Sequence, residues 1–140
     1  MKFWDSSALS CICGVEVHAA SVRRLAQADP DLIVWWGART ECLSALARAT
    51  REGRIDDPTQ LAYRAKLNGL ASAWREVSPS DHLRSAAGRL VFVHPLRAAD
   101  AFQLAAAMTW CLQQPGGKDF VCLDRRLREA AQREGFTVLP

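Results

Sequence analysis

The stretch FVCLDRRLREAAQREGFTVL, residues 120–139, predicts a strand, a helix and a second strand in immediate succession. The apolar run FVCL ends at Asp124, the charged run RRLREAAQRE is typical of an exposed helix, and Gly135 stands where a C-terminal cap is favoured. The apolar run FTVL closes the unit. Because parallel strands need a crossover connection such as a helix, this unit predicts a parallel sheet.

The same alternation extends back to the N-terminus. Further strands are predicted at residues 2–4, 32–36 and 75–77; the run LIVWW at 32–36 is uninterruptedly apolar, as in strands buried on both faces. Helices are predicted over residues 15–28, 38–51 and 57–74, from the SPSDH segment at 78–82 to about residue 90, and from about residue 100 to 113. We expect one α/β sandwich with a parallel sheet covered on both faces.

The helices at 38–51 and 57–74 are expected to form an antiparallel hairpin. Gly53 lies just past the end of the first helix, and Asp57 with Pro58 opens the second. The second helix is expected to face inward with Leu61, Ala65, Leu70 and Trp74.

Length and composition indicate a single domain over residues 1–140. Apolar types make up 49% of the chain and charged types 24%, which excludes a disordered protein. No apolar run reaches the roughly 18 residues of a membrane span, so no membrane partner is expected. Asp5 and Glu16 interrupt the N-terminal apolar region, and the five cysteines form no C-x-x-C pair, so we expect buried thiols in the cytoplasm.

Four acids stand at telling positions of this predicted fold. Asp5 and Asp124 directly follow strands, Asp100 stands where a helix opens, and Glu41 lies in the first turn of the helix after the second strand. Because ligands of open parallel sheets bind at the carboxyl ends of the strands, we expect these acids to face one cleft. Taken singly, each acid is explained as a helix cap or a favourable charge at a helix N-terminus.

Taken together, four converging carboxylates repel one another unless cations neutralise them. Mg²⁺ or Mn²⁺ suits such an oxygen-only site, whereas zinc prefers the His and Cys that the set lacks. A carboxylate-held ion activates water and stabilises charge on a phosphate, so the residues favour phosphodiester hydrolysis. An aspartate-nucleophile phosphatase would resemble D-x-D-x-[TV], but Asp5 is followed by Ser6, Ser7 and Ala8.

Four stretches carry a resemblance to a known family. KFWDSSAL at 2–9, ARTECLSAL at 38–46, HPLRAADAFQLAAAM at 94–108 and the C-terminal stretch at 120–139 resemble, in order and spacing, the PIN-domain ribonucleases, and most closely the VapC toxins of type II toxin–antitoxin modules. The resemblance spans essentially the whole chain and implies a PIN-like three-layer α/β/α sandwich with a central parallel sheet of four to five strands.

The resemblance also implies a function: a Mg²⁺- or Mn²⁺-dependent endoribonuclease that cuts RNA by a metal-activated water. It implies Asp5, Glu41, Asp100 and Asp124 as the catalytic acids, with Asp5, Asp100 and Asp124 holding the metal and Ser6 close to the site. A cognate antitoxin would neutralise the toxin, and a homodimer is expected. The wide apolar faces of the predicted hairpin suit an antitoxin helix or a second subunit. No role is assigned to Gln103.

The basic and aromatic residues are open to two interpretations each. Six arginines near the acids can hold RNA phosphates or simply form solvated helix faces, and Arg97 is the one most expected to bind substrate: Arg48, Arg51, Arg54, Arg97, Arg125 and Arg126. Trp36 is the tryptophan expected to reach the cleft. The net charge of +3 does not identify a binding partner. When the four predicted site acids are set aside, however, the chain has 18 basic and 11 acidic residues. The alternatives are a non-catalytic PIN-like module that binds RNA or protein and, less favoured, a small-molecule phosphatase.

Overall fold

The computed structural model describes residues 1–14 and 19–140, and its centre is a five-stranded parallel sheet. The strand order is β3-β2-β1-β4-β5, and every neighbouring pair is parallel. This confirms the predicted α/β class and the parallel sheet. The strands are β1 (Lys2–Trp4), β2 (Leu32–Trp35), β3 (Arg75–Val77), β4 (Asp119–Val121) and β5 (Thr137–Leu139).

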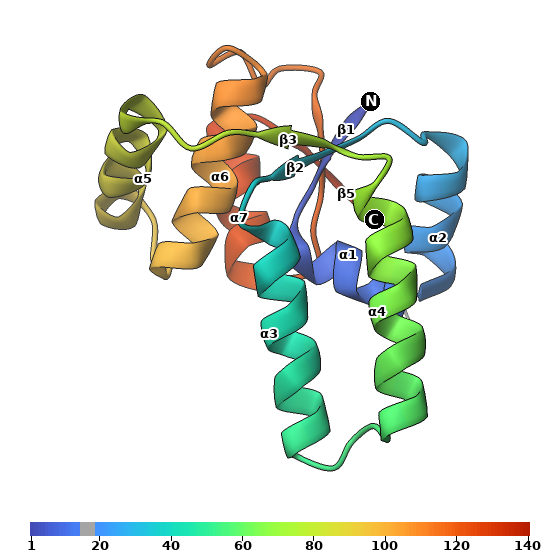
Figure 1. The fold of residues 1–140 in the computed structure, drawn as a ribbon. Helices are drawn as coiled ribbons and strands as arrows, with labels where there is room; N and C mark the ends of the chain where they lie inside the picture. The colour runs from blue at the N-terminus through green and yellow to red at the C-terminus, as the bar shows by residue number, and fades with distance from the viewer. Residues whose placement is uncertain (15–18) are drawn as a thin grey trace.

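Helices cover both faces of this sheet, which gives the three layers expected from the sequence (Figure 1). On one side lie α1, α2 and the α3/α4 pair, and on the other lie α5, α6 and α7. The bounds are α1 (Ser6–Cys13), α2 (Ala19–Ala28), α3 (Ala38–Arg51), α4 (Asp57–Ala71), α5 (Asp81–Val93), α6 (Ala98–Trp110) and α7 (Arg125–Glu134).

Part of the core lies where α6 packs against the sheet. Phe3 on the central strand is fully buried, is in register with Ile33 and Phe120, and stacks on the Phe120 ring at 5.3 Å between centroids. Helix α6 buries most of its length, and its alanines let it lie close against its neighbours. All five cysteines are buried and none forms a disulfide, as predicted. Within the described residues, no helix is both long and apolar enough to cross a membrane.

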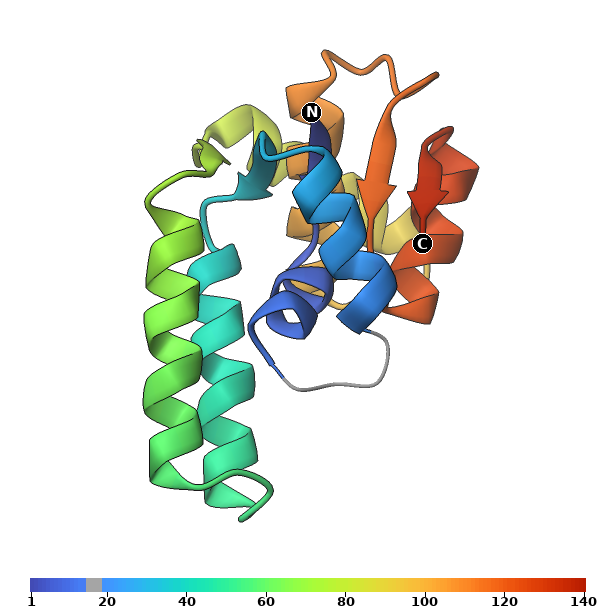
Figure 2. The same ribbon diagram turned by 90° about the vertical axis from the view of Figure 1, so that its right-hand side faces the viewer.

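The α3/α4 hairpin projects beyond the sheet as an antiparallel pair, as the sequence predicts (Figures 1 and 2). The predicted inward face of α4 is wrong in part. Leu61 is 62% exposed and Ala65 is also exposed, whereas Leu67 is buried and Tyr63 and Leu70 pack partly against the core. The stripe at helical spacing runs through positions 63, 67 and 70, because α4 rests on α1 and α3 along one side only.

Several predicted helix ends shift. The 57–74 helix ends at Ala71, and Trp74 is buried in the turn that leads into β3. The helix predicted to run to residue 113 ends at Trp110, because Leu112 and Gln113 adopt left-handed backbone angles with φ of 54° and 62°. Helix α5 continues three residues past the predicted end, to Val93. Of the helix predicted over 15–28, residues 15–18 lie outside the described part of the chain.

Candidate functional site

The four predicted acids line one cleft at the carboxyl edge of the sheet. Asp5 follows β1, Glu41 and Asp100 lie in the first turns of α3 and α6, and Asp124 caps the N-terminus of α7. The cleft has a volume of about 770 Å³. Helix N-termini converge here because β1, β2 and β4 are each followed by a helix that begins at this edge, and the helix dipoles favour negative charge at these N-termini.

Asp5 forms the floor of the cleft. Its backbone N–H donates to the Val121 carbonyl at 3.0 Å, which continues the β1–β4 ladder by one residue. Its carboxylate accepts the backbone N–H of Ser7 at 3.0 Å, the Ser7 hydroxyl, and the Cys122 thiol at 3.4 Å. The Asp5 side chain therefore has a fixed orientation, with only 3% of the residue exposed.

Glu41 is held by two donors on one oxygen. The Ser6 hydroxyl donates to Glu41 Oε2 at 2.8 Å, and the Gln103 side-chain amide donates to the same oxygen at 2.9 Å. Ser6 thus lies beside the acids, and its hydroxyl is also 3.5 Å from Asp5 Oδ1. Neither of these two donors binds Glu41 Oε1, so Ser6 and Gln103 fix one carboxylate oxygen and leave the other to different contacts.

Gln103 is the residue that sequence reasoning missed. It is fully buried on α6, three residues after Asp100, and it joins α6 to Glu41 on α3. Within the described part of the chain, its Oε1 has no hydrogen-bond partner. The available signal was a lone amide inside the apolar run FQLAAAM, since a buried polar side chain requires a partner.

Burial raises the pKa of three of these carboxyl groups. The pKa of Asp5 rises through burial, against the hydrogen bonds from Ser7 and Cys122, and the charge of Asp100 raises it further. The pKa of Glu41 likewise rises through burial, against the hydrogen bonds from Gln103 and Ser6. For Asp100, burial and then the charge of Asp124 raise the pKa. The acids therefore form one electrostatically coupled group that a cation would stabilise.

The donor set fits a hard divalent cation. The acids offer carboxylate oxygens with raised proton affinity in a cleft wide enough for water. Among the described residues, no three carboxylate, imidazole or thiol groups lie close enough together to hold a metal ion between them. Mg²⁺ commonly takes one or two carboxylates and keeps several waters, so an open carboxylate cleft is the kind of site that it uses.

Arginines surround the acids. Arg97, which directly precedes α6, lines the cleft as predicted, and so do Arg48, Arg125 and Arg126. Arg54 lies instead in another pocket. Arg125 also makes the i,i+4 pair with Glu129 expected of a solvated helix, at 3.1 Å. The prediction that Trp36 reaches this cleft is wrong, because Trp36 lines a different pocket at the end of β2.

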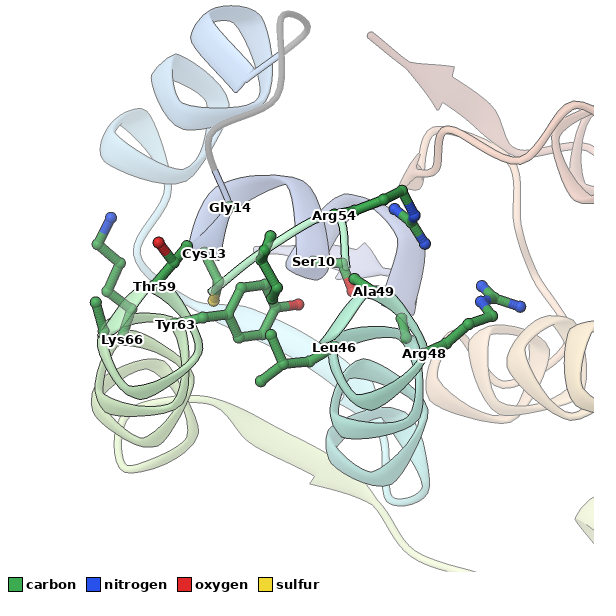
Figure 3. Close-up of a pocket in the computed structure, with 13 residues that line it drawn as sticks. Ser10, Cys13, Gly14, Leu46, Arg48, Ala49, Arg54, Thr59, Tyr63 and Lys66 are labelled. Carbon is green, nitrogen blue, oxygen red and sulfur yellow. The ribbon is translucent and has the colours of Figure 1, made fainter. Parts of the chain in front are cut away.

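A second pocket adjoins the cleft on the side of the hairpin. It lies between α1, α3 and α4, has a volume of about 230 Å³, and shares Ser10, Ala45 and Arg48 with the cleft. Figure 3 shows Leu46 and Tyr63 within it, and basic side chains at its edge.

Comparison with known proteins identifies the fold. No protein-family model and no curated protein sequence matches the chain. Among solved structures, the chain is similar to VapC20 of Mycobacterium tuberculosis, a sarcin-ricin loop cleaving toxin, with a TM-score of 0.71 and 17% sequence identity. The match covers 98% of this chain and 97% of that chain. The PIN-like fold implied by the sequence resemblance is thereby confirmed.

Proposed function

We propose that this protein is a metal-dependent endoribonuclease that acts as a toxin and is neutralised by a cognate antitoxin. One observation carries the proposal: Asp5, Glu41, Asp100 and Asp124 line a single cleft whose other charged residues are arginines. A cleft that served only to bind RNA phosphates would not place four carboxylates on its inner surface, because they repel a polyanion.

Different residues of the cleft would bind the RNA and the metal ion. Arg97 and the other cleft arginines bind phosphates of the RNA strand, through the bidentate geometry that guanidinium groups offer. Asp5, Asp100 and Asp124 would hold Mg²⁺ or Mn²⁺, and the chemistry that such an ion supplies when bound is water activation and stabilisation of charge on the phosphate.

Glu41 and Ser6 complete the site. With Oε2 fixed by Ser6 and Gln103, Glu41 can use its second oxygen to orient water or accept a proton. The raised pKa of Glu41, caused chiefly by burial, makes it a stronger base than an exposed glutamate. Ser6 contributes a hydroxyl within reach of both Glu41 and Asp5.

The pocket between α1, α3 and α4 suits a segment of an antitoxin. Its apolar wall, with Leu46 and Tyr63, would take an apolar side chain, and Arg48, Arg54 and Lys66 would attract an acidic peptide. Because Arg48 belongs to both this pocket and the cleft, a segment bound here would extend toward the acids and compete with RNA.

Homodimer formation would use exposed apolar residues such as Phe92. The buried free thiols accord with a place in the cytoplasm.

The test is cleavage of RNA by wild type and by Asp100→Asn, each with Mg²⁺, with Mn²⁺ and with EDTA. We expect cleavage by wild type with either metal, none in EDTA, and a severe loss in Asp100→Asn. The matched control is Asp57→Asn, which removes an acid on α4 outside the cleft and should cleave as wild type does. Cleavage that persists in EDTA, or in purified Asp100→Asn, would refute the proposal.

Titration with Mn²⁺ separates this function from a non-catalytic binding module. Saturable Mn²⁺ binding that Asp100→Asn weakens is expected of the enzyme. RNA binding with neither Mn²⁺ binding nor cleavage would favour the module. Turnover of a phosphomonoester with no cleavage of RNA would favour a phosphatase.

A further inference from the structure

A pocket with aromatic walls lies at the end of β2, beside the acidic cleft. It has a volume of about 390 Å³ and is lined by Trp35, Trp36, Pro79, Ser80, Asp81, Leu83, Arg84 and Phe102. The chain elements that carry cleft acids also build this pocket. Trp36 directly follows β2 and the cleft acid Asp5 directly follows β1, and these two strands are paired in the sheet with Trp4 opposite Val34. The pocket and the cleft therefore share the carboxyl edge of neighbouring strands, which places both along the path of one strand of nucleic acid.

Two rings form a fixed wall in this pocket. The buried Trp35 ring stacks on Phe102 with centroids 5.7 Å apart and planes 4° from parallel. Gly37 makes room for it, because a Cβ at that position would lie 2.5 Å from Trp35 Nε1. The wall is thus set by close packing between β2, the start of α3, and α6.

Trp36 provides a second, open ring. It meets Trp35 edge to face, at 6.3 Å between centroids and 68° between planes, and the residue is 57% exposed. Polar groups stand beside the rings: Ser80 caps α5, and Asp81 pairs with Arg84 at 2.8 Å. A flat apolar surface next to hydrogen-bonding groups matches an unpaired nucleobase, which has a π face and a polar edge.

A second copy of the chain is the competing occupant. The most exposed aromatic residue of α5 is Phe92, 93% exposed, but it lies at the opposite end of that helix. Nine residues separate it from Leu83, which corresponds to about 14 Å along the helix axis. The apolar end of α5 is therefore a separate surface, and the mixed polar and aromatic lining of the pocket favours a base.

We infer that this pocket binds one unpaired nucleobase of the RNA strand whose phosphodiester lies in the acidic cleft. Stacking against Trp36, beside the wall of Trp35 and Phe102, would fix the register of that strand relative to the cut. The inference rests on the proposed function for its ligand, and it assigns a binding role to Trp36 without any part in the chemical step.

The test measures RNA binding apart from cleavage. Labelled single-stranded RNA oligonucleotides are titrated in EDTA and followed by fluorescence anisotropy, for wild type, Trp36→Ala, Trp36→Phe and the control Leu61→Ala, which truncates an exposed apolar residue that lines neither this pocket nor the cleft. We expect Trp36→Ala to weaken binding by about 5- to 150-fold, because that is the range for loss of one base–aromatic stack. Trp36→Phe should retain most of the affinity, and Leu61→Ala should bind as wild type does.

A single abasic site moved along the oligonucleotide locates the bound base. In wild type one position should weaken binding, and in Trp36→Ala that same position should no longer matter. In the cleavage assay with Mg²⁺, Trp36→Ala should raise KM by more than it lowers kcat.

The outcomes are distinguishable. Equal RNA affinity of Trp36→Ala and wild type would overturn the inference even if RNA is cut. So would a homodimer that Trp36→Ala dissociates, with unchanged RNA affinity per protomer, since the pocket would then be a contact between copies. Trp36-dependent RNA binding without cleavage by any variant would support the pocket and refute the proposed enzyme.

Discussion

Replacement of Gln103 by methionine tests the polar contact that the site adds to an otherwise apolar helix. The change removes the amide donor to Glu41 Oε2 and, at the same time, the buried Oε1 that has no hydrogen-bond partner among the described residues. Methionine nearly matches glutamine in length and is a good helix former, so α6 and its packing should persist.

The two effects on the free energy of unfolding oppose each other. A hydrogen bond to a charged group contributes about 1.5–3 kcal/mol, and an unsatisfied buried polar atom costs about 1–3 kcal/mol. The free energy of unfolding of Gln103→Met should therefore lie within about 2 kcal/mol of the wild-type value. Gln103→Ala makes the same polar changes and leaves a cavity in a fully buried position, so it should lose an additional amount on the order of 2 kcal/mol or more.

The pH dependence supplies the second measurement. In wild type, burial raises the pKa of Glu41 and the Gln103 and Ser6 donors oppose that rise, so removal of one donor raises the pKa further. A carboxyl whose pKa is higher in the folded than in the unfolded state makes the fold lose stability as pH rises between the two pKa values. Gln103→Met should therefore lose more stability than wild type between about pH 4 and neutral pH.

The assay is urea denaturation in EDTA at a series of pH values, followed by circular dichroism. A loss of more than about 3 kcal/mol in Gln103→Met would refute the reasoning, because it exceeds the whole value of the lost hydrogen bond. An unchanged pH dependence would contradict the contact with Glu41. A serine-to-alanine change at Ser6, which removes the other donor, should reproduce the shift in pH dependence.

Three further predictions concern the metal site, an arginine of the cleft and the backbone. In EDTA, Asp100→Asn should melt at a higher temperature than wild type, because burial and the charge of Asp124 raise the pKa of Asp100. The difference in melting temperature should grow as pH rises. Added Mg²⁺ should then raise the melting temperature of wild type alone. Thermal melts across pH check this, and equal melting temperatures in EDTA would contradict it. Arg97→Ala should reduce the slope of log Kd for single-stranded RNA against log salt by about 0.7, and Arg64→Ala on α4 should leave it unchanged. Gln113→Gly should gain about 0.5–1 kcal/mol by relieving a left-handed φ of 62°, whereas Gly135→Ala, at φ 106° with its Cβ 3.2 Å from Pro115, should lose about 1 kcal/mol or more in urea denaturation.

The strand–helix–strand order was readable from the sequence because each element is locally consistent. Residues 120–139 alternate an apolar strand, a charged amphipathic helix and a capping glycine, and the structure has β4, α7 and β5 there. The placement of Asp5 and Asp124 in one cleft was also readable, since in a parallel sheet the residues after neighbouring strands share an edge.

Contacts that depend on the angles at which helices and strands pack could not be predicted from the sequence. Gln103 and Glu41 are 62 residues apart in the sequence. The 2.9 Å hydrogen bond from Gln103 Nε2 to Glu41 Oε2 depends on how α3 and α6 pack in the folded chain. The inward face of α4 was misassigned because Leu61 is apolar, yet its side chain is exposed in the structure. Trp36 was placed at the correct end of β2, but the orientation of its ring toward α5 depends on Trp35 and Phe102.

Asp5 joins two kinds of constraint in one residue. Its backbone N–H extends the sheet, its carbonyl accepts the N–H groups of Ala8 and Leu9 in α1, and its carboxylate both caps that helix and lines the acidic cleft. A genetic screen for non-toxic variants would therefore recover changes at position 5 through two routes, loss of soluble protein and loss of cleavage. Asp100, inside the first turn of α6, would be recovered chiefly through the second, which makes it the better position for an inactive form that still binds RNA and antitoxin.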